Sequence, residues 1–480
     1  MRPEQEVPFI SDAEIRDSLA AAKALKNDAD YVRAIIDKAR QAKGLTHREA
    51  AVLLEIDDPE LERELFRAAR DVKMRIYGNR IVLFAPLYVS NYCVNDCTYC
   101  GYKHSNGSIA RRRLTMEELA REVEILESLG HKRLALEAGE DPANCDLDYI
   151  LSCIRTIYSL KFKNGSIRRI NVNIAATTTD NYRRLADAQI GTYILFQETY
   201  HRPTYEKLHR KGPKRDYAWH TWAMDRAMEG GIDDVGLGVL YGLYDYKYDT
   251  VALLMHAEHL EERFGVGPHT VSVPRLRAAE GVSLERYPHL VSDEAFKRIV
   301  AVLRLSVPYA GMILSTRETS EFRDEVIDLG ISQISAGSST GVGGYYRDYV
   351  LKAAAGGEAD AAKAEKPQFE VGDHRSPREV LKSLCAKGYL PSYCTACYRE
   401  GRTGDRFMAL AKSGQIGNIC GPNAILTFKE YLLDYADDEL KAIGERAIRE
   451  NLERIPRASA RRITEDMLKR IEKGERDLRL

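Results

Sequence analysis

The stretch IVLFAPLYVSNYCVNDCTYC, residues 81–100, joins a largely apolar run to three closely spaced cysteines. Residues 81–89 are rich in β-branched and aromatic side chains, which predicts a buried strand. Cys93, Cys97 and Cys100 follow this strand with the spacing C-x3-C-x2-C. Parallel β/α proteins assemble their active sites from the loops that follow the strands. The three cysteines therefore stand where an active site is expected.

Seven further β-rich runs follow, and segments with apolar residues recurring at three and four positions separate them. Alternation of strand and helix is the signature of a parallel β/α architecture, and eight strands suffice to close a barrel. We therefore predict an α/β fold, a TIM-type (β/α)8 barrel, over residues 80–352. The later strands are predicted at residues 133–138, 169–176, 192–197, 234–240, 270–275, 312–317 and 331–337.

The segments on either side of the barrel have different patterns. Residues 1–79 contain capping-box spacings before amphipathic stretches, which predicts an N-terminal helical segment. Residues 353–374 are small, charged and without a sustained apolar face, which predicts an exposed linker. Residues 375–480 are predicted to form a mostly helical C-terminal domain, in which Pro422 begins a helix.

The composition limits the classes of partner and compartment. The 480-residue chain has a formal net charge of -1, which argues against a nucleic-acid surface. No signal peptide and no uncharged apolar run of bilayer length is recognisable, so we expect a cytoplasmic protein without a membrane partner. Nine cysteines in such a chain are expected to be reduced, and clustered ones are better interpreted as metal ligands than as disulfides.

The first cysteine cluster favours iron-sulfur chemistry. Thiolates are soft ligands that select zinc or iron-sulfur clusters. A structural zinc ion requires a fourth ligand, and His104 is the candidate nearby. The other interpretation is a cubane 4Fe-4S cluster whose fourth iron is left free for a small molecule.

The spacing C-x3-C-x-aromatic-C after the first strand of a β/α barrel resembles the hallmark of the radical S-adenosylmethionine enzymes. This resemblance implies that S-adenosylmethionine binds the open iron of a cluster held by Cys93, Cys97 and Cys100. It also implies that the reduced cluster cleaves the cofactor to a 5'-deoxyadenosyl radical. Tyr99 occupies the aromatic position, where members of the superfamily contact the adenine region.

Polar residues at other predicted strand ends agree with a cofactor site. The segment EAGE, with Glu137 and Glu140, resembles the glycine-rich segment that receives the methionine amino group. Asn173 and Glu198 follow the next two strands and suit ribose hydroxyls or the ammonium group. Arg275 suits the cofactor carboxylate, with an ion pair on the barrel rim as the alternative.

A second cluster, Cys394, Cys397 and Cys420, has the spacing C-x2-C-x22-C. Cys385 is a candidate fourth ligand for a zinc ribbon in this region. The spacing otherwise resembles the C-terminal auxiliary cluster of the FeFe-hydrogenase maturases that are radical tyrosine lyases. The resemblance extends over nearly the whole chain, and it is specific because both three-cysteine motifs occur together at the expected separation.

The activity of that family is what the resemblance implies for this chain. It is cleavage of the Cα–Cβ bond of L-tyrosine to p-cresol and dehydroglycine. The auxiliary cluster then converts dehydroglycine to CO and cyanide on a labile extra iron held with L-cysteine. The implied partners are an electron donor such as ferredoxin or flavodoxin and a hydrogenase maturation scaffold.

A tyrosine site needs a cation for the substrate carboxylate. Arg317, at the end of the seventh predicted strand, has the bidentate geometry for this role. Its alternative is an ion pair with Glu318 or Glu321. Ser335, at the eighth strand, is a second candidate for the same carboxylate. The resemblance makes His269 a candidate ligand of the labile iron, although a lone histidine near a strand start is usually structural.

Two other functions remain as hypotheses from the sequence. A thiazole-synthesis tyrosine lyase, a 2-iminoacetate synthase, shares the barrel and the tyrosine cleavage but lacks the C-terminal cysteine motif. A non-catalytic iron-sulfur scaffold needs no amino-acid pocket. Cys394, Cys397 and Cys420 argue against the first, and the polar strand ends argue against the second.

Overall fold

The structure is a computed structural model that describes residues 6–351 and 366–480. Eight parallel strands close into a barrel, because the long strand β1 (Arg80–Ser90) pairs with both β2 (Arg133–Ala138) and β8 (Gln333–Ser335). The predicted (β/α)8 barrel is confirmed. The intervening strands, each parallel to its neighbours, are β3 (Arg169–Asn173), β4 (Tyr193–Ile194), β5 (Val235–Gly238), β6 (Thr270–Ser272) and β7 (Gly311–Leu314).

Strand β4 is much shorter than the predicted run of residues 192–197. Beyond Ile194 the chain still follows β5, since the amides of Leu195 and Gln197 donate to the carbonyls of Gly236 and Gly238 at 3.1 and 2.9 Å. Its pairing with β3 is limited to Val172 and Tyr193. The strand therefore ends where the chain separates from β3, which the local sequence does not reveal.

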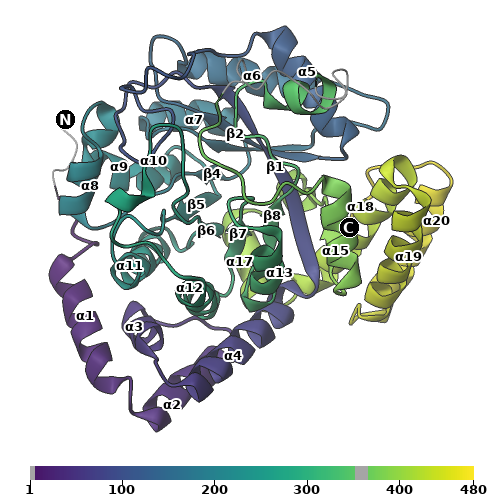
Figure 1. Cartoon of the computed structure of the whole chain (residues 1–480). Coiled ribbons are helices and arrows are strands. Elements are labelled where there is room, and N and C mark those ends of the chain that lie inside the picture. The colour runs from purple at the N-terminus through teal and green to yellow at the C-terminus, as the bar shows by residue number, and fades with distance from the viewer. Residues whose placement is uncertain (1–5, 352–365) are drawn as a thin grey trace.

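Helices surround the barrel (Figure 1). Among the described helices, none is both long and apolar enough to span a bilayer. The α-helices of the barrel are α5 (Met116–Ser128), α6 (Leu147–Ser159), α7 (Thr179–Asp187), α8 (Arg202–Leu208), α9 (Tyr217–Thr221), α10 (Ala223–Glu229), α11 (Tyr246–Phe264), α12 (Asp293–Ser306) and α13 (Ser320–Val326). Short turns of other helix types are η1 (Pro213–Arg215), η2 (Leu284–Arg286), η3 (Ile327–Leu329) and η4 (Tyr346–Leu351).

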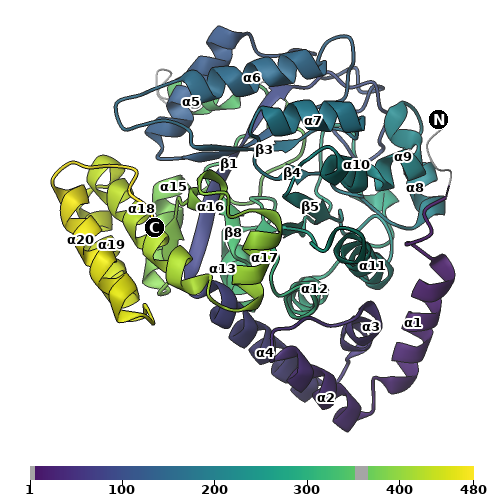
Figure 2. The ribbon, with the colours of Figure 1, turned by 180° about the vertical axis from the view of Figure 1, so that it is seen from behind.

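Four N-terminal helices pack against one side of the barrel, as Figures 1 and 2 show. They contact α11 and α12 and bury an apolar face there. The predicted capping box at Thr46 and Glu49 is present, and it satisfies two backbone amides at a helix start. The helices are α1 (Asp12–Leu25), α2 (Ala29–Ala39), α3 (His47–Glu55) and α4 (Pro59–Tyr77).

The C-terminal segment is mostly helical but also extends the barrel sheet. A ninth strand, β9 (Leu390–Ser392), pairs in parallel with the start of β1, from Arg80 to Val82. Figure 2 shows α16 and α17 near the barrel strands and α19 and α20 farthest from them. The helices are α15 (Pro377–Ala386), α16 (Ala396–Arg399), α17 (Gly404–Lys412), α18 (Gly417–Tyr435), α19 (Asp438–Glu453) and α20 (Ala458–Glu472).

The prediction that Pro422 begins its helix is wrong. Helix α18 begins at Gly417, and Pro422 lies inside it. The amide of Cys420 donates to the carbonyl of Ile416 at 2.8 Å, so Cys420 already belongs to the first turns. A proline there removes one helical hydrogen bond, a loss that the buried packing of the helix compensates.

The barrel lumen is lined by residues two apart along each strand. We name the cavity at the carboxyl ends of the strands the upper cavity and the one at their amino ends the lower cavity. Phe84 of β1 and Ser335 of β8 line the upper cavity, whereas Val82 and Gln333 line the lower one. On β2, Arg133 faces the lower cavity and Ala135 the upper one. Side chains alternate across a strand, so this spacing places two cavities at opposite ends of one lumen.

Part of the predicted linker does not extend into solvent. Residues 352–365 lie outside the described chain, whereas residues 366–373 cross the barrel mouth. We name residues 366–373 the strap. Its backbone donates from Gln368 to the Thr340 carbonyl at 3.0 Å and from Gly372 to the Thr316 carbonyl at 2.8 Å. The strap thereby ties together the loops that follow β7 and β8.

Candidate active site and auxiliary cysteine site

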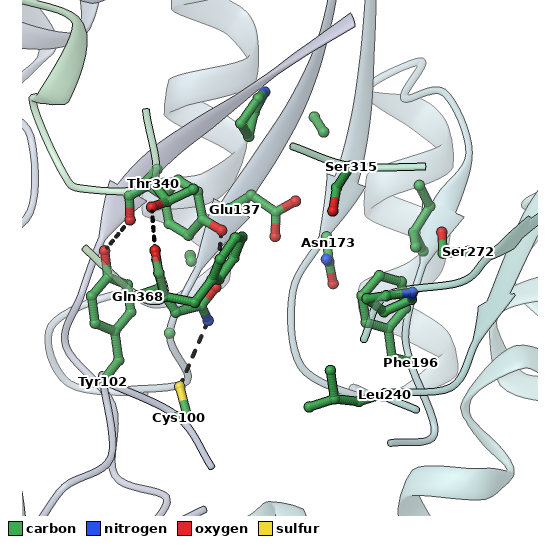
Figure 3. Close-up of a pocket in the computed structure, with 18 of the residues that line it drawn as sticks. Cys100, Tyr102, Glu137, Asn173, Phe196, Leu240, Ser272, Ser315, Thr340 and Gln368 are labelled. Carbon is green, nitrogen blue, oxygen red and sulfur yellow. Dashed lines mark hydrogen bonds between the residues drawn. The ribbon is translucent and has the colours of Figure 1, made fainter. Parts of the chain in front are cut away.

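The three cysteines that follow β1 line one cavity of about 220 Å³ at the carboxyl ends of the strands. Figure 3 shows Cys100 in this cavity. Gly139, after β2, lets the two loops meet, because a Cβ there would lie 2.3 Å from the Tyr92 carbonyl oxygen. Arg111 fixes the cysteine loop by donating to the carbonyls of Asn91 and Tyr102 at 2.7 and 2.8 Å. These contacts hold the three thiols at the cavity wall.

The thiols fit a cluster better than a single metal ion. Cys93, Cys97 and Cys100 are free of disulfides. In the described part of the chain, no three His, Cys, Asp or Glu side chains converge closely enough to share one ion. A cubane instead takes each thiolate on a different iron. Burial raises the pKa of Cys100 to about 11, which favours the neutral thiol in the protein without metal.

Two side-chain amides point at sulfur atoms of the cysteines. The Nδ2 group of Asn95 lies 3.8 Å from Cys93 Sγ, and Nε2 of Gln368 lies 3.7 Å from Cys100 Sγ. Donors to thiolate sulfur stabilise negative charge and tune the potential of iron-sulfur centres. Gln368 comes from the strap, where the sequence had predicted an exposed linker.

The residues predicted for the cofactor sleeve mostly line the same cavity. Glu137, Glu140, Asn173 and Tyr99 are all in its wall. Burial raises the pKa of Glu137 to about 8, opposed by a hydrogen bond from Asn173 and by the charge of Arg317. Tyr99 is hydrogen-bonded to His209 Nε2 at 2.7 Å, and Figure 3 shows Glu137 and Asn173 at the cavity.

Glu198 forms a buried ion pair that the sequence did not predict. Lys214 Nζ lies 2.6 Å from Glu198 Oε1, and both residues line the cavity. Burial disfavours the ammonium, but the negative charge of Glu198 opposes this effect, and the pKa of Lys214 is raised. Lys214 lies among several basic residues of one loop, so no local pattern distinguishes it.

Glu198 has a left-handed backbone, with φ at 69°. Such a conformation is costly for a residue with a side chain and persists only where neighbours impose it. Asp249 of α11 stabilises this backbone conformation through the two residues that follow Glu198. Its Oδ1 accepts from Tyr200 N at 2.7 Å and from Thr199 Oγ1 at 2.9 Å. Asp249 therefore orients the turn that presents Glu198.

Arg275 occupies the rim ion pair that the sequence left as its alternative. Its Nε donates to Glu318 Oε1 at 3.0 Å, and its Nη1 donates to Asp293 Oδ1 at 2.7 Å. Arg275 is not among the described residues that line the cavity. Because its guanidinium is satisfied by two carboxylates, the structure gives no support for the expected contact with a cofactor carboxylate.

Arg317 and Ser335, the residues predicted for a substrate carboxylate, both line the cavity. The Arg317 guanidinium lies over the ring of Phe369, with its carbon 3.3 Å from the ring centroid. Glu318 pairs with Arg275 and Arg277 instead. Ser335 Oγ accepts from the Thr316 amide at 3.1 Å. Both side chains thus line the cavity, and Arg317 contacts the strap through Phe369.

The second set of cysteines lies at the opposite end of the lumen. Cys394, Cys397 and Cys420 line a cavity of about 50 Å³ together with His269. Tyr398 is hydrogen-bonded to His269 Nε2 at 3.1 Å. Burial lowers the pKa of His269, and nearby arginines add to this effect while Asp234 opposes it. A neutral imidazole is the form that ligates metals.

Comparison with known proteins places the chain in a family. Residues 87–257 match the Radical SAM superfamily, and residues 272–390 match the Biotin and Thiamin Synthesis associated domain. A crystal structure of HydG, a maturase of the [FeFe]-hydrogenase, is 63% identical, covers 99% of this chain and 100% of that chain, and has a TM-score of 0.93. The chain belongs to the HydG family.

More distant relatives agree with this assignment. The family member from Carboxydothermus hydrogenoformans is 39% identical over 96% of this chain and 99% of that chain, with a TM-score of 0.81. The 2-iminoacetate synthase of Escherichia coli (strain K12) is 33% identical over 74% of this chain and 89% of that protein. The predicted family is confirmed, and the chain is a radical SAM enzyme. That membership implies a 4Fe-4S cluster and S-adenosylmethionine.

Proposed function

We propose that this chain cleaves L-tyrosine at the Cα–Cβ bond, giving p-cresol and dehydroglycine, and then converts dehydroglycine to CO and cyanide for [FeFe]-hydrogenase assembly. One observation carries the proposal: two three-cysteine sites occupy opposite ends of a single barrel lumen. The likeness to HydG over the full chain supports it. The atoms balance, because dehydroglycine equals CO, HCN and one water.

The upper cavity suits radical cleavage of an amino acid. When bound, the reduced cluster and S-adenosylmethionine supply a 5'-deoxyadenosyl radical. Arg317 and Ser335 hold the tyrosine carboxylate, which points the amino group toward the cofactor. The strap closes the mouth and keeps water from the radical. Fixing both reactants on strand ends supplies the orientation that a selective hydrogen abstraction requires.

The cofactor is held by residues at the carboxyl ends of β2 and β3 and in the loops that follow β1, β2 and β4. Glu137 and Glu140 receive the methionine ammonium group, and Asn173 and Glu198 receive ribose hydroxyls or the same ammonium. Lys214, which lies beside Glu198, takes the cofactor carboxylate in place of Arg275. Tyr99 contacts the adenine. Cys93, Cys97 and Cys100 bind the cluster.

The lower cavity suits the second half of the reaction. Cys394, Cys397 and Cys420 bind an auxiliary cluster, and His269 binds a labile extra iron that L-cysteine helps to hold. An electron donor such as ferredoxin or flavodoxin reduces the protein, and a hydrogenase maturation scaffold receives the product. We place these steps in the cytoplasm, where cysteines stay reduced.

The other candidate is a 2-iminoacetate synthase that releases the fragment without converting it. The identity of 33% to the Escherichia coli enzyme favours it. Anaerobic protein reconstituted with iron and sulfide, then given S-adenosylmethionine, dithionite and tyrosine, tests both. We expect 5'-deoxyadenosine, p-cresol and CO. Deoxyadenosine without p-cresol would contradict the substrate, and p-cresol without CO would favour the synthase.

A further inference from the structure

Three arginines with incomplete hydrogen bonding lie at the lower end of the barrel. They are Arg80, Arg133 and Arg169, the first residues of β1, β2 and β3, and we name them the floor arginines. The Nε atom of each is buried without a hydrogen-bond partner, and within the described chain none of the three pairs with a carboxylate. Buried guanidinium charges without a counter-ion are costly, which points to an anion in this cavity.

Two of the floor arginines line the cavity beside the second set of cysteines. Arg133 is 6% exposed, and its Nη2 donates to the Cys394 carbonyl at 3.0 Å. Arg80 lines the same cavity. Arg169 does not line it but stacks on Tyr398, with the guanidinium carbon 3.4 Å from the ring centroid. Arg169 thereby fixes the Tyr398 ring that borders the cavity.

The acidic group near the floor arginines is already engaged. Asp234 accepts from the Gly404 amide at 3.1 Å and lies 3.3 Å from His269 Nδ1. Among the described residues that line this cavity there is no carboxylate, and the three cysteines become anionic as thiolates. A cluster bound to them would account for some of the positive charge. Arg133 nevertheless projects from the lumen wall two residues below Ala135, which lines the upper cavity. Arg133 therefore lies where a small molecule that passes from the upper cavity to the cysteines would meet its guanidinium.

We propose that Arg80 and Arg133 form a carboxylate site that receives a two-carbon α-imino acid from the upper cavity. The inference rests on the proposed function, because removal of p-cresol from tyrosine leaves HN=CH–COO⁻, which keeps its carboxylate. A planar guanidinium recognises carboxylate by paired hydrogen bonds.

The proposed site predicts how the α-imino acid divides between conversion to CO and escape from the protein. A fragment that escapes takes up water and releases ammonia, giving glyoxylate. In Arg133→Gln and in Arg80→Gln we expect unchanged p-cresol, CO lowered about tenfold and glyoxylate raised to match, as loss of one charged hydrogen bond implies. Arg133→Lys keeps the charge and should restore part of the CO. Arg399→Gln is the matched control, because Arg399 follows Cys397 closely but pairs with Asp477 at 2.6 and 2.7 Å.

A binding measurement separates this inference from the proposed function. The measurement is equilibrium dialysis of radiolabelled glyoxylate against reconstituted protein, without S-adenosylmethionine or tyrosine. We expect Arg133→Gln to bind glyoxylate about tenfold more weakly than the unaltered protein, and Arg399→Gln to bind it as tightly as the unaltered protein. Equal binding in all variants would overturn the inference. So would loss of the auxiliary cluster from Arg133→Gln and Arg80→Gln, measured by iron content and electron paramagnetic resonance. Absence of p-cresol from the unaltered protein would instead contradict the proposed function alone.

Discussion

Phe369 lies beneath Arg317, with the guanidinium carbon 3.3 Å from the ring centroid. Arg317 follows β7 in the loop at the barrel mouth, whereas Phe369 belongs to the strap. The strap is held in turn by Gly101 in the cysteine loop, whose amide donates to the Gln368 carbonyl at 3.2 Å. A Cβ at Gly101 would lie 2.7 Å from that carbonyl oxygen, so the contact requires glycine. The strap therefore links the cluster loop to the substrate arginine.

Phe369→Leu should weaken tyrosine binding with little effect on the chemical step. A desolvated cation–π contact contributes about 0.5–2 kcal/mol, so KM for tyrosine should rise about 2–30-fold. Phe369→Tyr keeps an aromatic face and serves as the control. Initial rates of p-cresol formation give both constants, and an unchanged KM in Phe369→Leu would show that the ring does not position Arg317.

Gln368→Leu should make the cluster harder to reduce. The amide donor to Cys100 stabilises the more negative reduced state, and a hydrogen bond of about 0.5–1.5 kcal/mol corresponds to a potential about 20–60 mV lower without it. Tyr88→Phe is a milder comparison, because it removes only the 2.9 Å hydrogen bond that orients the Gln368 side chain. Redox titration followed by electron paramagnetic resonance measures the three reduction potentials, which should be highest in the unaltered protein and lowest in Gln368→Leu. Equal potentials in all three proteins would contradict it.

Binding of S-adenosylmethionine should strengthen as pH rises toward 8. Burial raises the pKa of Glu137 to about 8, so the side chain is mostly protonated at lower pH in the protein without cofactor. Pairing with an ammonium needs the carboxylate, and affinity should therefore increase up to about tenfold per pH unit below that pKa. Equilibrium dialysis from about pH 6 to 9 measures this dependence. Any pH dependence of the affinity that remains in Glu137→Gln arises from titration of S-adenosylmethionine itself. The same pH dependence in Glu137→Gln and in the unaltered protein would refute the role of Glu137.

His269→Ala should lose the extra iron more readily than either cluster. The imidazole lies at the lower cavity with its pKa lowered, so it is neutral and able to bind metal. Iron and sulfide counts after mild chelation measure the difference. Tyr398→Phe is the comparison, because it removes the hydrogen bonds of the Tyr398 hydroxyl to His269 Nε2 and Thr192 Oγ1 and leaves the imidazole in place. Equal loss of all iron would indicate a structural histidine.

The sequence predicted the barrel because its strands are locally distinct. Each of the eight runs is apolar and bounded by helical patterns, and every predicted run contains the observed strand or overlaps it. Strand β9 was missed since it has three residues, one of them Pro391, and pairs only with the distant Arg80–Val82 segment. Pairing of this kind depends on tertiary contact and leaves no periodic signal.

The candidate site was partly predictable for the same physical reason. Glu137 and Asn173 lie at the carboxyl ends of their strands and Arg317 follows β7 by three residues, so the barrel topology brings them together. Lys214 and Gln368 come from irregular segments, and their placement depends on contacts with Glu198 and Tyr88 that no local pattern encodes. Arg275 was misleading because a strand-end arginine suits a cofactor and a rim ion pair equally well.

The central claim is that the two cysteine sites divide the reaction. The double variant Cys394→Ala/Cys397→Ala removes thiols at the lower cavity and leaves Cys93, Cys97 and Cys100 intact at the other end of the lumen. Anaerobic assays with S-adenosylmethionine and tyrosine should measure p-cresol and CO from the same samples. The account predicts that p-cresol persists and CO disappears, whereas CO at the level of the unaltered protein would contradict it.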